Sequence, residues 1–256
     1  MKKRLISILL ALCMVLALVP GTVLGANAPA TSGSCGANGS NVTWSFNQST
    51  GTLTISGSGA MADYCENYVE YLAPDWAIFT KEIKTVVISE GITHVGDSSF
   101  GGAIIGRTME NLTSVQLPNT LISIGKYAFS GSHKLKSITF SSKLRSIGNS
   151  AFYNSGLTSV NFPSSLTTIE DAAFQSTQLT SVYIGANVTK LGTYGGHFIF
   201  ASPNLAAITV DPANPNYASE DGVLYNKAKT QLIAYPLGST TKHFVLPATL
   251  KGDLEL

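Results

Sequence analysis

The feature that most constrains this chain is an internal repeat of 22 or 23 residues. The stretches LTSVQLPNTLISIGKYAF, LKSITFSSKLRSIGNSAF, LTSVNFPSSLTTIEDAAF and LTSVYIGANVTKLG begin at Leu112, Leu135, Leu157 and Leu179. An earlier block starts at Ile83, a sixth starts at Leu205, and HFVLP at His243 resembles the opening of a seventh. A unit this short cannot bury its own apolar side, so equivalent residues of successive units must stack into a shared core.

Each block begins with a short strand. Val115 and Leu117 alternate with the polar Ser114 and Gln116, which is the period of a strand with one buried face. A turn and a second short extended or turn-like piece follow. The fold class predicted is therefore mainly β: a leucine-rich-repeat solenoid with short parallel strands along one face, an N-terminal β-hairpin cap and an inserted C-terminal hairpin.

Two further positions of the block carry structural expectations. A glycine follows thirteen residues after each start, and we expect it to turn the chain with φ > 0, with Glu170 as the exception; the glycines are Gly96, Gly125, Gly148 and Gly192. An aromatic ring follows four residues later, and we expect these rings to lie in file; they are Phe100, Phe129, Phe152 and Phe174, with Gly196 at that position in the fifth block and Phe198 close by.

The N-terminus has the pattern of a secretory signal peptide. MKKR precedes an apolar run from Leu5 to Val19, and Pro20 and the small residues of TVLGANA follow it. Residues 1–25 are therefore predicted to be cleaved, with an uncleaved membrane anchor as the alternative. The mature chain is expected to be secreted or displayed on the cell surface, with no membrane contact after cleavage.

The remaining boundaries follow from composition. The small and polar residues 26–41 are predicted to be a flexible tether. Residues 42–82 are predicted to cap the array, because VTWSFNQSTGTLTISG has the pattern of a hairpin. The array covers 83–256, with a second hairpin inserted around 214–238, where two apolar arms flank NKAKT.

The blocks resemble the BspA-type leucine-rich repeats of bacterial surface proteins. The pattern L-T-S-V-x-L-P-x-x-L-x-S-I-G-x-x-A-F matches over Ile83 to Phe174. The tyrosine-rich segment from Asn214 to Gly238 and the segment from Ser34 to Met61 resemble elements found with such repeats. The resemblance implies a repeat solenoid, and it implies adhesion to host matrix proteins or cells. The cysteine often found after the A-F pair in such repeats is absent here.

Residues for catalysis or metal binding do not form a recognisable set. No G-x-S-x-G motif occurs, and the four histidines fall in different blocks without a partner at metal-ligand spacing. The acidic group Asp63, Glu66, Glu70 and Asp75 favours a solvated face, with calcium binding as the alternative. We therefore predict a protein that is not an enzyme and has no metal site and no cofactor.

Other residues leave two interpretations open. Cys35 and Cys65 form a disulfide in an oxidising exterior, or they stay unpaired and buried. Trp44 and Trp76 pack inside the cap, or they form platforms for sugars. Nucleic acid is not an expected partner, because only 12% of residues are charged, the formal net charge is +1, and no face can be strongly positive.

The outward positions of the first strand are the candidate binding surface. Its more varied column is predicted to meet the partner and consists of Gln116, Thr139, Asn161, Tyr183 and Thr209. Ordinary solvent-facing strand residues are the alternative. The function predicted is a non-catalytic adhesion module that presents a rigid face to an extracellular protein, a cell surface or a glycan. The alternatives are a non-catalytic arm of a larger secreted hydrolase, and a structural spacer.

Overall fold

The computed structural model describes residues 29–64, 73–102, 108–192, 199–240 and 247–250. The chain divides into two compact units, Met1–Ala30 and Thr31–Leu256. Only residues 29 and 30 of the first unit are described, so the account below concerns the second. The predicted signal peptide lies outside the described residues. None of the helical segments described is long and apolar enough to cross a membrane.

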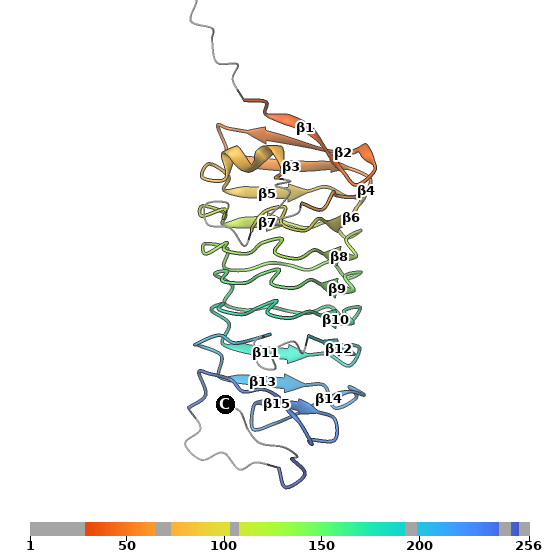
Figure 1. Ribbon diagram of the computed structural model, residues 1–256, viewed down its shortest axis with the longest axis vertical. Helices are drawn as coiled ribbons and strands as arrows, with labels where there is room; N and C mark the ends of the chain where they lie inside the picture. The colour runs from red at the N-terminus through yellow and green to blue at the C-terminus, as the bar shows by residue number, and fades with distance from the viewer. Residues whose placement is uncertain (1–28, 65–72, 103–107, 193–198, 241–246, 251–256) are drawn as a thin grey trace, which may run out of the picture. The chain divides into compact units, whose positions relative to one another are not determined.

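The second unit is a stack of coils, one for each sequence block (Figure 1). One sheet joins the N-terminal cap to the first two coils. Its strands, in order, are β1 (Ser32–Gly36), β2 (Gly39–Asn47), β3 (Thr52–Gly57), β5 (Thr85–Ile88) and β7 (Ser114–Gln116). The first three strands are antiparallel, and β3, β5 and β7 run parallel. The predicted hairpin of the cap is thus also the first layer of the array.

Residues 32–36 correct the predicted tether. They form β1, which pairs with β2 through Ser32↔Ser45 and Gly33↔Trp44. The small and polar composition suggested a flexible chain, but the backbone of β2 supplies hydrogen-bond partners that composition does not reveal. Cys35 also points into the core, with 3% of its surface exposed.

A second sheet runs along the stack. It consists of parallel two- to four-residue strands from successive coils: β4 (Gly59–Ala60), β6 (Ile92–Val95), β8 (Ser123–Ile124), β9 (Ser146–Ile147), β10 (Thr168–Ile169) and β12 (Lys190–Leu191). The last residue of each strand from β6 onward is buried. The piece that the sequence predicted as extended or turn-like therefore forms the largest sheet among the described residues.

The predicted strands of the first face are less continuous. Residues 137–140 and 159–162 lie in the same place in their coils but form no assigned strand, and pairing resumes between β11 (Ser181–Ile184) and β13 (Ala207–Val210). These segments remain tied to the coil before, because the Thr158 N–H donates to the Lys136 carbonyl at 3.1 Å. The mainly β solenoid is confirmed, with two parallel ladders where one was expected.

The repeat needs glycine at this position for a different reason from the one predicted. Gly96, Gly125, Gly148 and Gly192 do not have positive φ; the positive φ falls two residues after the glycine position, on Ser98, Tyr127, Ser150 and Ala172. What excludes a side chain is the neighbouring coil. A Cβ on Gly148 would lie 2.8 Å from the Lys126 nitrogen, and one on Gly125 would lie 2.6 Å from the Asp97 nitrogen.

An aromatic column fills the interior, as predicted. It contains Trp76, Phe100, Phe129, Phe152, Phe174 and Phe200, and consecutive ring centroids are 5.3–6.0 Å apart. The fifth block contributes Phe200, whereas Gly196 and Phe198 lie outside the described residues. The backbone reinforces the column, because the Phe129 N–H donates to the Ala151 carbonyl at 2.8 Å and the Phe152 N–H donates to the Ala173 carbonyl at 2.9 Å.

The end segments follow the prediction with one addition. The short 3₁₀ helix η1 (Asp75–Phe79) lies in the cap and buries Trp76 and Phe79. Near the C-terminus, β15 (Val223–Asn226) and β16 (Leu232–Ala234) form the antiparallel hairpin expected around NKAKT. A third strand, β14 (Tyr217–Glu220), pairs with β15 as well. The seventh block start at His243 lies outside the described residues.

Candidate functional site

The predicted binding residues form an exposed column on the first face. Gln116, Thr139, Asn161, Tyr183 and Thr209 are all exposed. Register places Tyr183 directly beside Thr209 in the β11–β13 pair, and it places Gln116 beside Val87 at the other end. Thr139 and Asn161 lie in the extended segments between these pairs. We call these five residues the exposed column.

Tyr183 is the most distinctive member of the exposed column. Its side chain is 53% exposed, yet its hydroxyl donates to the Asp211 Oδ2 at 2.7 Å. Asp211 is held in turn, because its Oδ1 accepts the Ala213 N–H at 2.8 Å. The Tyr183 hydrogen bond lowers the pKa of Asp211, and the same bond raises the pKa of Tyr183. The ring is thus exposed to solvent and also fixed in place.

A polar hollow that sequence reasoning missed lies in the middle of the array. It is an open depression, and it is lined by Arg145, Ser164, Ser165, Thr167, Asn187 and Thr189. Several of these groups bond to the coil before, as in the Thr167 hydroxyl that donates to the Arg145 carbonyl at 3.0 Å.

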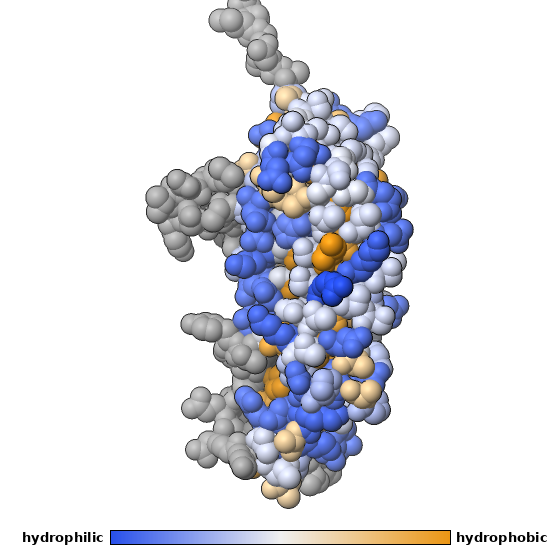
Figure 2. Space-filling view, turned by 90° about the vertical axis from the view of Figure 1, so that its right-hand side faces the viewer, coloured by the Kyte–Doolittle hydropathy of each residue, from blue (hydrophilic) through white to orange (hydrophobic). Residues whose placement is uncertain are grey.

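The side of the array shown in Figure 2 is mostly hydrophilic, with apolar residues in small separate patches. This side suits polar contacts better than apolar docking.

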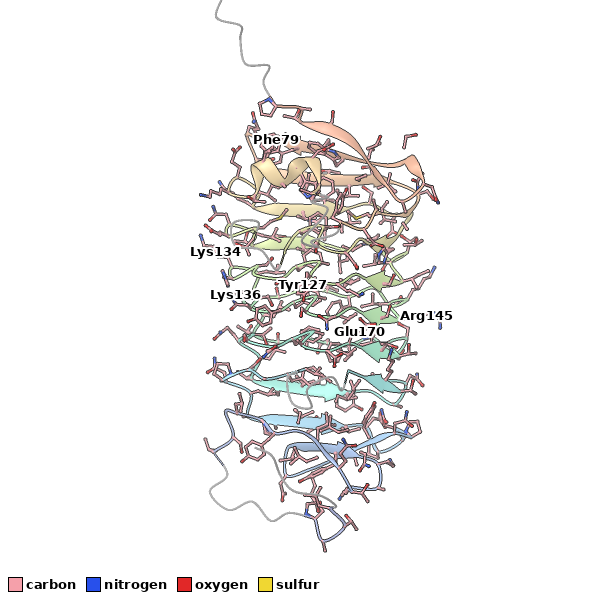
Figure 3. All side chains as sticks on the ribbon, in the orientation of Figure 1. Phe79, Tyr127, Lys134, Lys136, Arg145 and Glu170 are labelled. Atoms are coloured by element: carbon pink, nitrogen blue, oxygen red, sulfur yellow. The ribbon has the colours of Figure 1, made fainter. Side chains whose placement is uncertain are left out.

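Basic residues gather in the central coils without forming one positive face. Residues 111–169 contain five Lys and Arg residues and no Asp or Glu; they are Lys126, Lys134, Lys136, Lys143 and Arg145. Figure 3 places Lys134 and Lys136 on one edge of the stack and Arg145 on the opposite edge. Ion pairs join His94 to Asp63 and Lys229 to Glu220, and neither pair involves one of these five residues.

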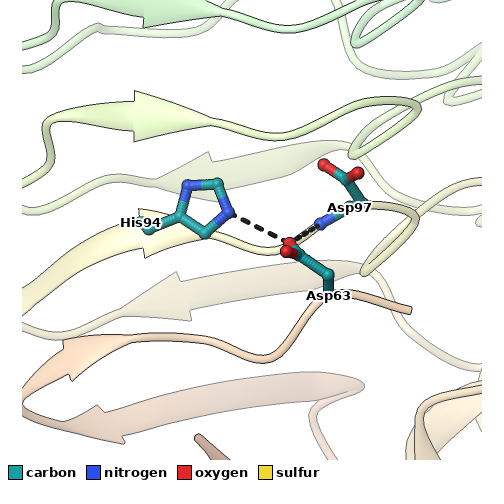
Figure 4. A group of neighbouring side chains, drawn as sticks. All are labelled: Asp63, His94 and Asp97. Atoms are coloured by element: carbon teal, nitrogen blue, oxygen red, sulfur yellow. Dashed lines mark hydrogen bonds and ion pairs between the residues drawn. The ribbon is translucent and has the colours of Figure 1, made fainter. Parts of the chain in front are cut away.

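A second cluster joins the cap to the first coil. The His94 Nε2 lies 3.2 Å from the Asp63 Oδ1, and the same oxygen accepts the Asp97 N–H at 2.9 Å (Figure 4). One ligand-type atom from each of Asp63, His94 and Asp97 lies within 4.8 Å of the other two. Burial acts to raise the pKa of Asp63, but the hydrogen bonds from Asp97 and His94 and the nearby positive charge outweigh it, so the pKa is lowered.

Sequence reasoning missed this cluster because stacking creates it. Asp63 is 31 residues from His94 in the sequence. Asp63 follows β4 and His94 lies in β6, which are neighbouring strands of the second sheet. The sequence grouped Asp63 with Glu66, Glu70 and Asp75, of which Glu66 and Glu70 lie outside the described residues. The expectation that no histidine has a suitable partner is wrong for His94, which has two aspartates beside it. The signal was available only by aligning the blocks, where His94 is the one histidine at its position and Asp97 is matched by Asp171 alone.

The same histidine also contacts Ser123, which raises the question of nucleophilic catalysis. The Ser123 Oγ lies 2.7 Å from the His94 Nδ1. In serine hydrolases the serine meets Nε2 and the carboxylate meets Nδ1, which is the reverse of this arrangement. Two N–H groups close in sequence to Ser123 are also in use, because Ile122 donates to the Thr93 carbonyl and Gly125 donates to the Val95 carbonyl, both at 2.8 Å. These groups offer no stabilisation to an oxyanion.

The remaining predicted residues belong to the cap. Trp44 and Trp76 are buried, with 2% and 0% of their surface exposed and ring centroids 5.7 Å apart, so they pack the cap and are not sugar platforms. Cys35 is buried, and burial raises the pKa of its thiol to about 12. Its predicted partner Cys65 lies outside the described residues, so the disulfide stays a prediction.

Comparison with known proteins matches the repeats to one family. The family described as the BspA type leucine rich repeat region matches residues 107–214 in six copies. The fold is similar to a leucine-rich repeat protein from Eubacterium ventriosum, with 32% identity and a TM-score of 0.73 over 87% of this chain. No curated protein matches the chain.

Two more distant structures share the fold alone. The pneumococcal vaccine antigen PcpA is 21% identical with a TM-score of 0.53, and a leucine rich cell surface protein from Faecalibacterium prausnitzii is 22% identical with a TM-score of 0.54. Each match covers 82% of this chain. The chain spans only part of each of these proteins: 55% of the Eubacterium protein, 58% of PcpA and 64% of the Faecalibacterium protein.

Proposed function

Because the array of this chain belongs to the BspA-type leucine-rich repeat family, we propose that it is a non-catalytic binding module that uses the exposed column to hold an extracellular protein or glycan. BspA-type repeats are generally found in surface and binding proteins, and one structural relative is described as a cell surface protein. The signal-peptide pattern at the N-terminus supports the same location. The finer role, adhesion to a particular partner, is part of the proposal.

The observation that carries the proposal is the state of Tyr183. Tyrosine is enriched in binding surfaces because its large amphipathic ring gives contact area at a small cost in conformational entropy. An exposed tyrosine whose hydroxyl is already held by Asp211 loses little further freedom when a partner covers it. Asn161 and Gln116 add amide donors and acceptors along the same face.

The stacked backbone supports the proposal from a second direction. Parallel pairing sets Tyr183 beside Thr209, and backbone hydrogen bonds such as that from Ala206 to the Thr180 carbonyl, 2.9 Å long, hold coil against coil. A face fixed in this way binds without reorganising, so many modest contacts add up. No such argument favours a catalytic role, since the Ser123–His94–Asp63 contacts have the wrong ring orientation and no oxyanion donors from the flanking N–H groups.

The experiment is a binding screen with matched surface variants. The purified protein is immobilised and exposed to matrix proteins, cells and a glycan array. Tyr183→Ala combined with Asn161→Ala is expected to weaken retention of a ligand at least about tenfold, since truncating central aromatic contacts costs on the order of 2 kcal/mol. Tyr153→Ala is the control, because Tyr153 is 38% exposed but lies outside the exposed column.

Three results would contradict the proposal. Retention that is unchanged in the double variant would remove the exposed column as the binding surface. Absence of any retained ligand, together with tolerance to deletion of one whole block, would favour a spacer. Product release from a glycan or peptide substrate that is lost in Ser123→Ala would favour an enzyme.

A further inference from the structure

The cluster of Asp63, His94 and Asp97 has the composition of a metal site. The three residues come from separate positions of the fold: Asp63 follows β4, His94 lies in β6, and Asp97 lies in the turn after β6. Their ligand-type atoms lie within 4.8 Å of one another, and the Nε2 of His94 is 3.2 Å from the Asp63 Oδ1. Two carboxylates and one imidazole are ligands that first-row divalent metals accept.

The repeat itself does not require these residues. The other coils carry Ser123, Ser146, Thr168 or Lys190 at the place of His94, and they carry Lys126, Asn149 or Asp171 at the place of Asp97. All of these coils stack with the same register. A histidine beside two aspartates is therefore a local departure from the repeat, which the stacking of the backbone does not explain.

One oxygen of each aspartate has a structural role. The Asp63 Oδ1 accepts the Asp97 N–H at 2.9 Å, and the Asp97 Oδ1 accepts the Lys126 N–H at 2.6 Å. Glu170 accepts the Asn149 N–H of the coil before it at 3.1 Å, and this contact involves no histidine. Carboxylates that cap the turn of a neighbouring coil are thus a recurrent device of this array. The device uses one oxygen of Asp63 and of Asp97, and it does not call for His94.

The second nitrogen of His94 is held as metal ligands usually are. The His94 Nδ1 lies 2.7 Å from the Ser123 Oγ. When Nδ1–H donates to that hydroxyl, the lone pair of Nε2 faces the Asp63 carboxylate. Two electron-rich atoms in this position need a cation between them, either a proton or a metal. A hydrogen bond on the far nitrogen is the outer-shell contact that fixes the tautomer and orientation of metal-binding histidines.

From this geometry we propose that Asp63, His94 and Asp97 bind one divalent transition-metal ion of the Zn²⁺ class. The ion takes the place of the proton between the His94 Nε2 and the Asp63 carboxylate, and Asp97 supplies the third ligand. Water completes the coordination, because the side chains of His94 and Asp63 are 25% and 64% exposed. Since Asp63 belongs to the cap and His94 to the first coil, the bound ion clamps the cap to the array.

Lys126 gives the proposal an internal control. Its charge lies close enough to contribute to the lowered pKa of Asp63, so it opposes a second cation at the site. Replacing it with an uncharged side chain of similar length, Lys126→Met, is expected to strengthen metal binding. The backbone N–H that Asp97 accepts is retained in that variant, so the cap of the turn is unchanged.

The test is calorimetric titration of the untagged full chain with ZnCl₂ at pH 7.5. We expect one Zn²⁺ per chain at this site, at least about tenfold weaker binding in His94→Ala and in Asp97→Asn, and tighter binding in Lys126→Met. His133→Ala is the matched control, because His133 is an exposed histidine of another coil, and its affinity should equal that of the parent. Parallel titration with CaCl₂ shows whether carboxylates alone account for the signal.

Thermal unfolding separates a lost ligand from a lost fold. Zn²⁺ should raise the Tm of the parent and of His133→Ala, and it should not raise the Tm of His94→Ala or Asp97→Asn. Asp97→Asn keeps an oxygen that accepts the Lys126 N–H, so it tests the site even if His94→Ala unfolds. No Zn²⁺ binding by the parent, equal binding by both ligand variants, or Ca²⁺ binding that matches Zn²⁺ and ignores His94→Ala would overturn the proposal.

Discussion

The ring of Phe152 stacks on the ring of Phe174 from the next coil, with centroids 5.3 Å apart and planes 9° from parallel. Both side chains are fully buried. Replacing Phe152 with alanine removes contacts with two coils at once, because the ring also stacks on Phe129 at 5.4 Å. We expect Phe152→Ala to lower the free energy of unfolding by about 3–5 kcal/mol.

Chemical denaturation of the variant and of a neighbour measures this effect. Tyr153→Ala is the matched control, since Tyr153 is the adjacent residue and is 38% exposed. Its loss should change stability by no more than about 0.5 kcal/mol. Equal effects of the two substitutions would mean that the column is not the core of the array.

The repeat glycines give a second prediction, which separates close approach from backbone conformation. Gly148→Ala places a Cβ 2.8 Å from backbone atoms of the coil before, while Gly185→Ala meets nothing within 4 Å. Neither glycine has a positive φ. We expect Gly148→Ala to destabilise by about 1–3 kcal/mol through overpacking, and Gly185→Ala to be close to neutral. Denaturation midpoints that agree for the two variants would refute the close-approach explanation.

Glu170 supports the third prediction, since it occupies a glycine position and caps the coil before. Its carboxylate accepts the Asn149 N–H at 3.1 Å in a partly buried setting. Glu170→Ala removes that acceptor and should cost about 1 kcal/mol, whereas Glu170→Gln retains an oxygen and should cost less. Hydrogen exchange at the Asn149 amide is the direct measurement. Exchange that is equally slow in Glu170→Ala and the parent would show that the cap is not needed.

The Tyr183–Asp211 hydrogen bond gives a pH prediction. The hydrogen bond from Tyr183 lowers the pKa of Asp211, because it stabilises the ionised carboxylate. The contact is therefore fully formed when the pH is above the ordinary pKa of an aspartate, and it is lost as the pH falls through the lowered pKa of Asp211. Tyr183→Phe removes the hydroxyl and should raise the pKa of Asp211 toward its ordinary value. Carboxyl carbon chemical shifts followed by NMR titration report the change. An unaltered Asp211 pKa in Tyr183→Phe would contradict the contact.

Much of the fold could be predicted from the repeat, because period and stacking leave few alternatives. The alignment of Phe129 with Phe152 and Phe174 followed from their spacing alone. The role of Gly148 did not, since a glycine is equally typical of a positive φ and of a close approach. Composition also misled for Ser32–Gly36, where the pairing partner and not the residue types decides the structure.

The candidate sites were predictable only where they follow the period. The exposed column repeats from block to block, so its exposure could be expected from alternation along the strand. The His94 cluster is a departure from the period, and its members meet only after the cap and the first coil have stacked. The Asp211 partner of Tyr183 lies 28 residues away in a loop that no periodic pattern marks.

The central claim is that neighbouring coils share one core through the aromatic column. A double-mutant cycle on Phe129 and Phe152, each changed to leucine, tests it most directly. We predict a coupling in the free energy of unfolding of about 0.5–1.5 kcal/mol for this stacked pair. The same cycle on Phe100 and Phe174, which the column separates by two rings, should give a coupling near zero. Strict additivity in the Phe129–Phe152 cycle would contradict the claim.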